Sequence, residues 1–148
     1  MFRFSRAVLT AGLTGTMIGV AVPAWAASTP PGTNEQGYCT PEPQGDNVHA
    51  SGGDASGHGW WLEGSCTAPY ATVTVQLYEE VNGTWEEKAS ADGSLPSGGG
   101  SGNRITARAV CASSTATNWR SYVSAVVYGE QYGSAQIETP VVSIACRL

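Results

Sequence analysis

Hydrophobic and polar residues alternate with a period of two through most of the chain after residue 60. The alternation is clearest over residues 71–81, where Val73, Val75 and Leu77 are separated by threonine and glutamine. Successive side chains of a β-strand point to opposite faces of a sheet, so this pattern predicts a strand with one buried face. No segment sustains the period of 3.6 residues that is typical of a helix. Further strands are predicted over residues 60–66, 84–90, 104–111, 119–128 and 141–147.

A tight turn at Asn82-Gly83 joins two of the predicted strands. Both central positions of a type I′ turn require positive φ, which Asn and Gly tolerate best, so residues 84–90 are expected to return antiparallel. The two-residue turn also fixes the register of the hairpin. It places Trp85 on the same face as Tyr78, opposite the aliphatic side chains, unless a bulge reverses the alternation.

Two segments lack a strand pattern. Residues 41–59 are rich in Pro, Gly, Asp and Ser, and we interpret them as a long loop or a loosely paired edge strand. Residues 92–103 have the composition of a flexible loop. Short strands separated by turns, without helices, predict an all-β fold: an antiparallel β-sandwich of immunoglobulin-like or related topology.

The first 26 residues have the features of a secretory signal. Arg3 and Arg6 precede an apolar stretch over residues 7–22 that is too short and too interrupted to span a bilayer, and Ala24-Trp25-Ala26 matches an Ala-x-Ala cleavage site. We therefore expect a secreted, extracellular protein. The predicted organisation is a signal peptide over residues 1–26, a flexible leader over residues 27–37 and a single β-sandwich domain over residues 38–148.

The charge of the chain excludes two classes of partner. The formal net charge of −5 becomes −7 when Arg3 and Arg6 leave with the signal, and the chain contains no basic run. An acidic surface of this kind disfavours binding to nucleic acid or to an anionic membrane.

Four cysteines behind an export signal predict two disulfides, because the exported environment is oxidising and no Cys-x-x-Cys pair is present. We favour Cys39 with Cys66 and Cys111 with Cys146, which would pin each terminal segment to a central strand. The alternative joins Cys66 to Cys111 across the two sheets, as in immunoglobulin domains, and pairs Cys39 with Cys146.

Several segments together resemble a known group of proteins. They are the strands 62–66, 73–77 and 107–111, the 82–85 turn, the Trp119-Arg120-Ser121 step and a cysteine two residues from the C-terminus. This pattern resembles small secreted two-disulfide proteins of Streptomyces and related actinobacteria. The resemblance covers most of the chain after the signal. It implies the fold and the export, and it implies no activity.

Candidate catalytic and metal-binding residues are few. The only histidines, His49 and His58, lie in one Gly/Ser-rich segment, and no Gly-x-Ser-x-Gly motif is present, so we predict no hydrolase triad. Together with Asp46 and Asp54 these histidines could ligate zinc or copper, but their spacing matches no metal motif. We interpret them as solvated loop residues and expect no metal and no cofactor.

Four glutamates flank the predicted hairpin turn. A glycosidase needs two carboxylates on either side of a cleft, and the hairpin register places Glu79 opposite Glu86. Two like charges at this distance cost stability unless they are solvated or matched by a cation such as Lys88. The chain supplies no surrounding cleft, so we predict a solvated acidic hairpin tip and no enzymatic activity. The glutamates are Glu79, Glu80, Glu86 and Glu87.

Alternation places several aromatic residues on the face opposite the aliphatic set. Period two counted back from an inward Cys66 puts Trp60 and Leu62 inside and Trp61 outside. Such rings could stack on a polysaccharide or anchor a protein interface, or some of them could belong to the core. The candidate ligand-binding residues are Trp61, Tyr78, Trp85, Arg120, Tyr122 and Tyr128.

These observations predict a secreted, monomeric, non-enzymatic binding protein, whose partner is an extracellular protein or a cell-surface polysaccharide. A first alternative is a small inhibitor of a secreted protease or glycosidase that acts through a loop at residues 92–103 or 113–118. A second alternative is a structural surface protein. An inhibitor needs a rigid loop, whereas a polysaccharide binder needs coplanar, exposed aromatic rings.

Overall fold

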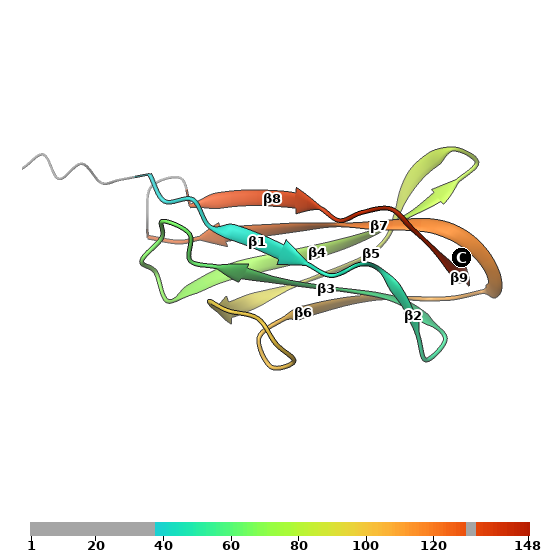
Figure 1. The fold of residues 1–148 in the computed structure, drawn as a ribbon, viewed down its shortest axis with the longest axis horizontal. Helices are drawn as coiled ribbons and strands as arrows, with labels where there is room; N and C mark the ends of the chain where they lie inside the picture. Colours follow the sequence, from blue (N-terminus) through green and yellow to red (C-terminus); the bar gives the residue numbers. More distant parts are fainter. Residues whose placement is uncertain (1–37, 130–132) are drawn as a thin grey trace, which may run out of the picture. The chain divides into compact units, whose positions relative to one another are not determined.

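A computed structural model describes residues 38–129 and 133–148 of the chain. The predicted signal (residues 1–26) and leader (residues 27–37) lie outside the described residues. Within the described part, nine β-strands form two antiparallel sheets, and no helix is present that could cross a membrane (Figure 1). The predicted all-β sandwich is confirmed.

Sheet A is built around one central strand. Strand β3 (Asp54–Leu62) pairs on one edge with β6 (Ile105–Val110). Its other edge is shared by two short strands, β1 (Glu42–Gly45) and β2 (His49–Ser51), which follow one another along it. The interruption between β1 and β2 therefore faces the middle of β3.

Sheet B has the order β5-β4-β7-β8, with β9 also paired to β7. Because β6 returns to β3 and β7 returns to β4, the chain alternates between the two sheets in the manner of an immunoglobulin-like sandwich. The strands of sheet B are β4 (Tyr70–Val81), β5 (Thr84–Pro96), β7 (Ser113–Val127), β8 (Ser134–Glu138) and β9 (Val142–Arg147).

The predicted disulfide pairing is confirmed. Cys39 is bonded to Cys66, which joins the segment before β1 to the segment after β3. Cys111 is bonded to Cys146, which joins the connection between β6 and β7 to strand β9. The alternative bridge between Cys66 and Cys111 is wrong.

The core lies between the inner faces of the two sheets, where β3 and β6 pack over β4 (Figure 1). Val73, Val75 and Leu77 are fully buried there, as their alternation predicts. Glycine at the inner positions of β3 allows the sheets to approach closely. A Cβ atom at Gly59 would lie 2.6 Å from Cγ2 of Val75 and 2.7 Å from Cγ1 of Val123.

The β4–β5 hairpin has the predicted turn and register. Asn82 and Gly83 both have positive φ, at 53° and 80°. A bulge does occur in β5, but it falls at Lys88, farther from the turn than Trp85. Tyr78 and Trp85 therefore share the outer face of sheet B, as predicted.

Three segments assigned to loops are wholly or partly strands. Residues 41–59 contain β1, β2 and the first half of the central strand β3. Residues 92–96 continue β5, which leaves only the rest of the 92–103 segment as a loop, and residues 113–118 belong to β7. In β3 the small side chains that made the segment look like a loop are buried, because they lie where the sheets or strands approach most closely.

Candidate functional site

Four of the six predicted ligand-binding residues converge on the outer face of sheet B. Tyr78 comes from β4, Trp85 from β5, and Arg120 and Tyr122 from β7. These strands are neighbours in the sheet, and alternation directs all four side chains away from the core. We call these four residues the aromatic–arginine cluster.

Arg120 occupies the centre of the aromatic–arginine cluster. Its guanidinium carbon lies 4.2 Å from the centroid of the Trp85 ring and 5.2 Å from that of Tyr122, both within the range of a cation–π contact. Nη1 of Arg120 also donates to Oε1 of Glu138 on β8 at 2.6 Å. The Tyr78 and Tyr122 rings meet edge to face, with centroids 5.2 Å apart and an angle of 81°. The cation is thus held in place by three neighbouring side chains.

Carboxylates fix the two tyrosine hydroxyls. Tyr78 Oη donates to Oε2 of Glu87 at 3.2 Å, and the side chain of Gln76 donates to the same oxygen at 2.9 Å. Partial burial, followed by the hydrogen bond to Glu87, raises the pKa of Tyr78 above its ordinary value of 10.0. A hydrogen bond to Glu138 raises the pKa of Tyr122 in the same direction. Both phenols therefore act as neutral hydrogen-bond donors at ordinary pH.

Negative charge prevails around the aromatic–arginine cluster. Cross-strand register places Glu80, Glu87, Asp92 and Glu138 on the same outer face as Arg120. Asn118 donates to Oε2 of Glu80 at 2.8 Å, which orders one further carboxylate at the edge of the cluster. The face therefore presents aromatic rings and a guanidinium within an acidic surround.

The prediction that Trp61 lies outside is wrong. Trp61 is fully buried, and its indole N–H donates to the carbonyl of Leu95 at 3.0 Å. Strand β3 ends at Leu62, and the chain then turns at Gly64, which has a φ of 57°. Alternation counted back from Cys66 crosses this turn and so assigns each residue of β3 to the opposite face.

Tyr128 is exposed, as predicted, but it does not join the aromatic–arginine cluster. Its side chain is 71% exposed and lies just beyond the end of β7. Six residues of extended chain separate it from Tyr122, a distance of about 20 Å. No coplanar platform of exposed rings forms among the described candidates, because Trp61 is in the core, Arg120 covers Trp85, and Tyr78 meets Tyr122 edge to face.

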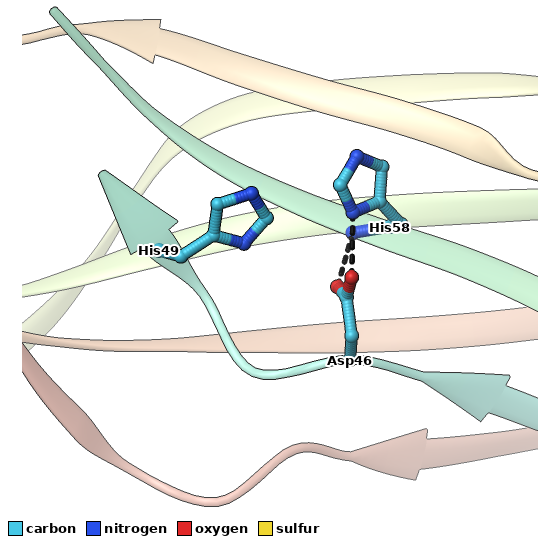
Figure 2. Close-up of side chains that lie close together, drawn as sticks. All are labelled: Asp46, His49 and His58. Carbon is cyan, nitrogen blue, oxygen red and sulfur yellow. Dashed lines mark hydrogen bonds and ion pairs between the residues drawn. The ribbon is translucent and has the colours of Figure 1, made fainter. Parts of the chain in front are cut away.

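A second group of polar side chains, which we call the histidine cluster, consists of Asp46, His49 and His58 (Figure 2). The interpretation of His49, Asp54 and His58 as loop residues is wrong, because they lie in β2 and β3, and His58 is not solvated either, since it is only 6% exposed. His49 lies in β2, and Asp46 lies in the gap between β1 and β2. Asp54 is not part of the cluster, and it pairs with Arg108 at 3.6 Å.

Asp46 bridges the gap in the edge strand. Its backbone N–H donates to the carbonyl of His58 at 3.2 Å, and its Oδ1 accepts the backbone N–H of His58 at 2.8 Å. A side-chain carboxylate thus replaces a backbone carbonyl in the ladder. The second oxygen, Oδ2, lies 2.6 Å from Nδ1 of His58. The His49 ring stacks on His58, with centroids 5.2 Å apart and an angle of 29°.

One buried hydroxyl next to the histidine cluster has no partner. Ser56 lies directly opposite His49 in the register and shares a face of β3 with His58. Its Oγ is buried and makes no hydrogen bond within the described part of the chain. It therefore does not form the Ser–His contact that a hydrolase triad requires.

The hairpin glutamates do not form one solvated group. Glu79 faces Glu86, as the register predicts, but Glu79 points inward and is fully buried. Its carboxylate accepts the backbone N–H of Leu148 at 3.3 Å and lies 3.8 Å from Nζ of Lys88. Lys88 also donates to Glu86 at 2.8 Å, and this hydrogen bond raises the pKa of Lys88. Lys88 supplies the neutralising cation, and Glu79 holds the C-terminal residue.

Sequence reasoning found the aromatic–arginine cluster, and it named Asp46, His49 and His58 as possible metal ligands but dismissed them as solvated loop residues. Alternation along two strands and one hairpin turn was enough to place Tyr78, Trp85 and Tyr122 on one face. No sequence signal pairs Asp46 with His58, because the glycine- and serine-rich character of β3 hides a central strand.

No protein-family model matches the chain, and no curated protein matches its sequence.

Proposed function

We propose that this chain is a secreted, non-enzymatic binding protein that engages an extracellular protein through the outer face of sheet B. The observation that carries the proposal is the position of Arg120, held 4.2 Å from the Trp85 ring and 5.2 Å from the Tyr122 ring. Trp, Tyr and Arg are the residues that most often dominate the energetics of protein interfaces. Because neighbours already order these side chains, binding would cost less conformational entropy.

A protein partner fits the aromatic–arginine cluster better than a polysaccharide does. Stacking on a sugar requires ring faces that are open to solvent and lie in one plane. Arg120 covers Trp85, and the Tyr78 and Tyr122 rings meet at 81°. Rings in this arrangement would present edges, hydroxyls and a guanidinium, which suit the mixed surface of a protein.

The charge of the outer face favours a cationic partner. Glu80, Glu87, Asp92 and Glu138 share this face with Arg120. Complementary charge would steer association and would make the association rate fall as salt concentration rises.

The proposal includes that the protein is secreted and that it is a monomer. The sequence features of residues 1–26 and the resemblance to small secreted actinobacterial proteins support secretion, and two disulfides are compatible with an oxidising extracellular environment. A non-enzymatic role is supported by Ser56, whose hydroxyl makes no hydrogen bond within the described part of the chain and so forms no Ser–His pair. The inhibitor alternative loses support because residues 92–96 and 113–118 lie in β5 and β7.

Retention of proteins exported by the source cells tests the proposal. Residues 27–148, purified with both disulfides intact, would be immobilised beside the Arg120→Ala variant. Arg108→Ala is the matched control, because Arg108 is a half-exposed arginine on the outer face of sheet A. We expect at least one cationic protein to bind the unmodified protein and Arg108→Ala and to be lost from Arg120→Ala. Equal retention by all three, or binding only to chitin, cellulose or peptidoglycan, would contradict it.

A further inference from the structure

Both imidazoles of the histidine cluster are fixed through Nδ1. In His58, Nδ1 lies 2.6 Å from Oδ2 of Asp46. An ionised carboxylate can only accept hydrogen bonds, so Nδ1 of His58 carries a proton, and in the neutral imidazole Nε2 carries the free lone pair. Asp46 is itself held by two hydrogen bonds to the backbone of His58, which leaves the ring little freedom to turn.

The second imidazole follows the same rule. Nδ1 of His49 lies 3.2 Å from the carbonyl oxygen of Asn47. A carbonyl oxygen also accepts only, so Nδ1 of His49 is the protonated nitrogen and Nε2 is the free one. Figure 2 shows one ring nitrogen of each histidine on the side away from Asp46. Histidines that bind metals typically donate their other ring N–H to a carboxylate or a backbone carbonyl. His58 donates to the carboxylate of Asp46, and His49 donates to the carbonyl of Asn47.

The distances allow one ion to reach the cluster. Candidate ligand atoms, one from each of Asp46, His49 and His58, lie within 4.8 Å of one another. A metal–nitrogen bond of about 2.1 Å places two ligands of one ion at most about 4.2 Å apart. His58 is buried, but His49 and Asp46 are half-buried, so rotation of the His49 side chain is the movement that would bring its Nε2 to an ion on Nε2 of His58.

The unpartnered hydroxyl of Ser56 supports a ligand at this place. Its Oγ is buried and lies on the face of β3 that carries His58, directly opposite His49. Leaving a buried hydroxyl without a hydrogen bond costs about 1–3 kcal/mol. A water molecule on a bound ion would give this oxygen a partner.

We propose that the histidine cluster binds a divalent transition-metal ion, with Cu²⁺ as the ion held most tightly. Nε2 of His49 and Nε2 of His58 are the protein ligands, and Asp46 is the residue that positions His58. Imidazole donors with open positions for water suit Cu²⁺, which also stands highest in affinity among the divalent first-row ions. The site lies on sheet A and is independent of the binding face on sheet B.

Titration with Cu²⁺ tests this site. Residues 27–148 would be purified without a polyhistidine tag and titrated in competition with a chelator of known affinity. Electron paramagnetic resonance would report the ligands, because imidazole nitrogens split the Cu²⁺ signal. His49 and His58 are the only histidines of the chain, so any imidazole signal comes from this cluster. The variants are His49→Gln and Asp46→Asn, and Asp54→Asn is the matched carboxylate control.

We expect one Cu²⁺ per chain with imidazole nitrogen splitting. Loss of a carboxylate that orients a metal-binding histidine costs about 10- to 100-fold in metal affinity, so Asp46→Asn should weaken binding by this factor. His49→Gln should weaken it at least as much, and Asp54→Asn should not change it. If Asp46→Asn does not fold, His49→Gln still decides, because that side chain is half-exposed. Absence of Cu²⁺ binding, or unchanged binding by His49→Gln, would overturn the proposal.

Discussion

The guanidinium of Arg120 lies 4.2 Å from the centre of the Trp85 ring, so a cation from β7 covers an aromatic ring from β5. The two residues reach across β4, which separates their strands in the sheet. The register of β4 with β5 and the register of β4 with β7 together bring Trp85 and Arg120 into contact across the sheet. The aromatic–arginine cluster is therefore assembled by the fold before any partner is present.

The energy of this contact can be measured with a double-mutant cycle. We expect Trp85→Leu and Arg120→Met to show a coupling free energy of about 0.5–1 kcal/mol, as for a partly exposed cation–π pair. Urea unfolding of the unmodified protein, both single variants and the double variant gives this value. A coupling energy indistinguishable from zero would mean that the two side chains do not interact in solution.

Close approach of the two sheets at Gly59 predicts a large effect of one added methyl group. A Cβ atom there would lie 2.6 Å from Val75 and 2.7 Å from Val123, so Gly59→Ala should destabilise the protein by about 1–3 kcal/mol. Gly102 is the matched control, because a Cβ atom there meets nothing within 4 Å. Urea unfolding that finds both alanine variants equally stable would place the sheets farther apart than the structure does.

The buried carboxylate of Glu79 predicts that its loss destabilises the protein more than loss of the opposing Glu86. Glu79→Ala leaves the backbone N–H of Leu148 without its acceptor, and we expect a loss of about 1–3 kcal/mol. Glu86 is the opposing residue on β5 and is half-exposed, so Glu86→Ala should change stability by less than about 0.5 kcal/mol. Equal effects in thermal or urea unfolding would show that Glu79 is solvated in solution.

Three raised pKa values predict a loss of stability in alkali. Burial raises the pKa of Tyr78, and hydrogen bonds to Glu138 and Glu86 raise those of Tyr122 and Lys88. The folded state holds these protons more tightly than the unfolded chain, so their stabilisation is complete below the unfolded pKa values. It is lost as the pH rises through the folded values.

Urea unfolding at about pH 9 and about pH 11 measures this loss. We expect the free energy of unfolding to fall between the two. The fall should be smaller in the Tyr78→Phe/Tyr122→Phe double variant, which retains only the Lys88 contribution of these three. If the free energy of unfolding falls by the same amount in the double variant, the alkaline loss of stability does not come from Tyr78 and Tyr122.

Alternation and turn chemistry predicted most of sheet B from the sequence. The β4 strand has bulky aliphatic residues at every second position, and Asn82-Gly83 determines the register of its partner. These are local signals, and local signals also placed Tyr78, Trp85 and Tyr122 together. The disulfide pairing, which was favoured because each bridge would pin a terminal segment to a central strand, is confirmed.

Apart from β6, which was predicted over residues 104–111, sheet A could not be predicted in the same way, because its signals are non-local. The inner face of β3 carries Gly57 and Gly59, whose fit depends on Val75, Leu77 and Val123 of the opposite sheet. A strand whose inward residues are glycines has no hydrophobic period to detect. The turn at Gly64 then shifted the alternation counted from Cys66 and placed Trp61 on the wrong face.

The most direct test of the binding role is the dissociation constant of a retained cationic protein for the unmodified chain and for Arg120→Ala. An interface anchor contributes about 1.4 kcal/mol or more, so we predict that the Kd rises at least about tenfold in Arg120→Ala. Arg108→Ala should leave the Kd unchanged. A Kd that is the same for the unmodified protein and Arg120→Ala would contradict a binding role for the outer face of sheet B.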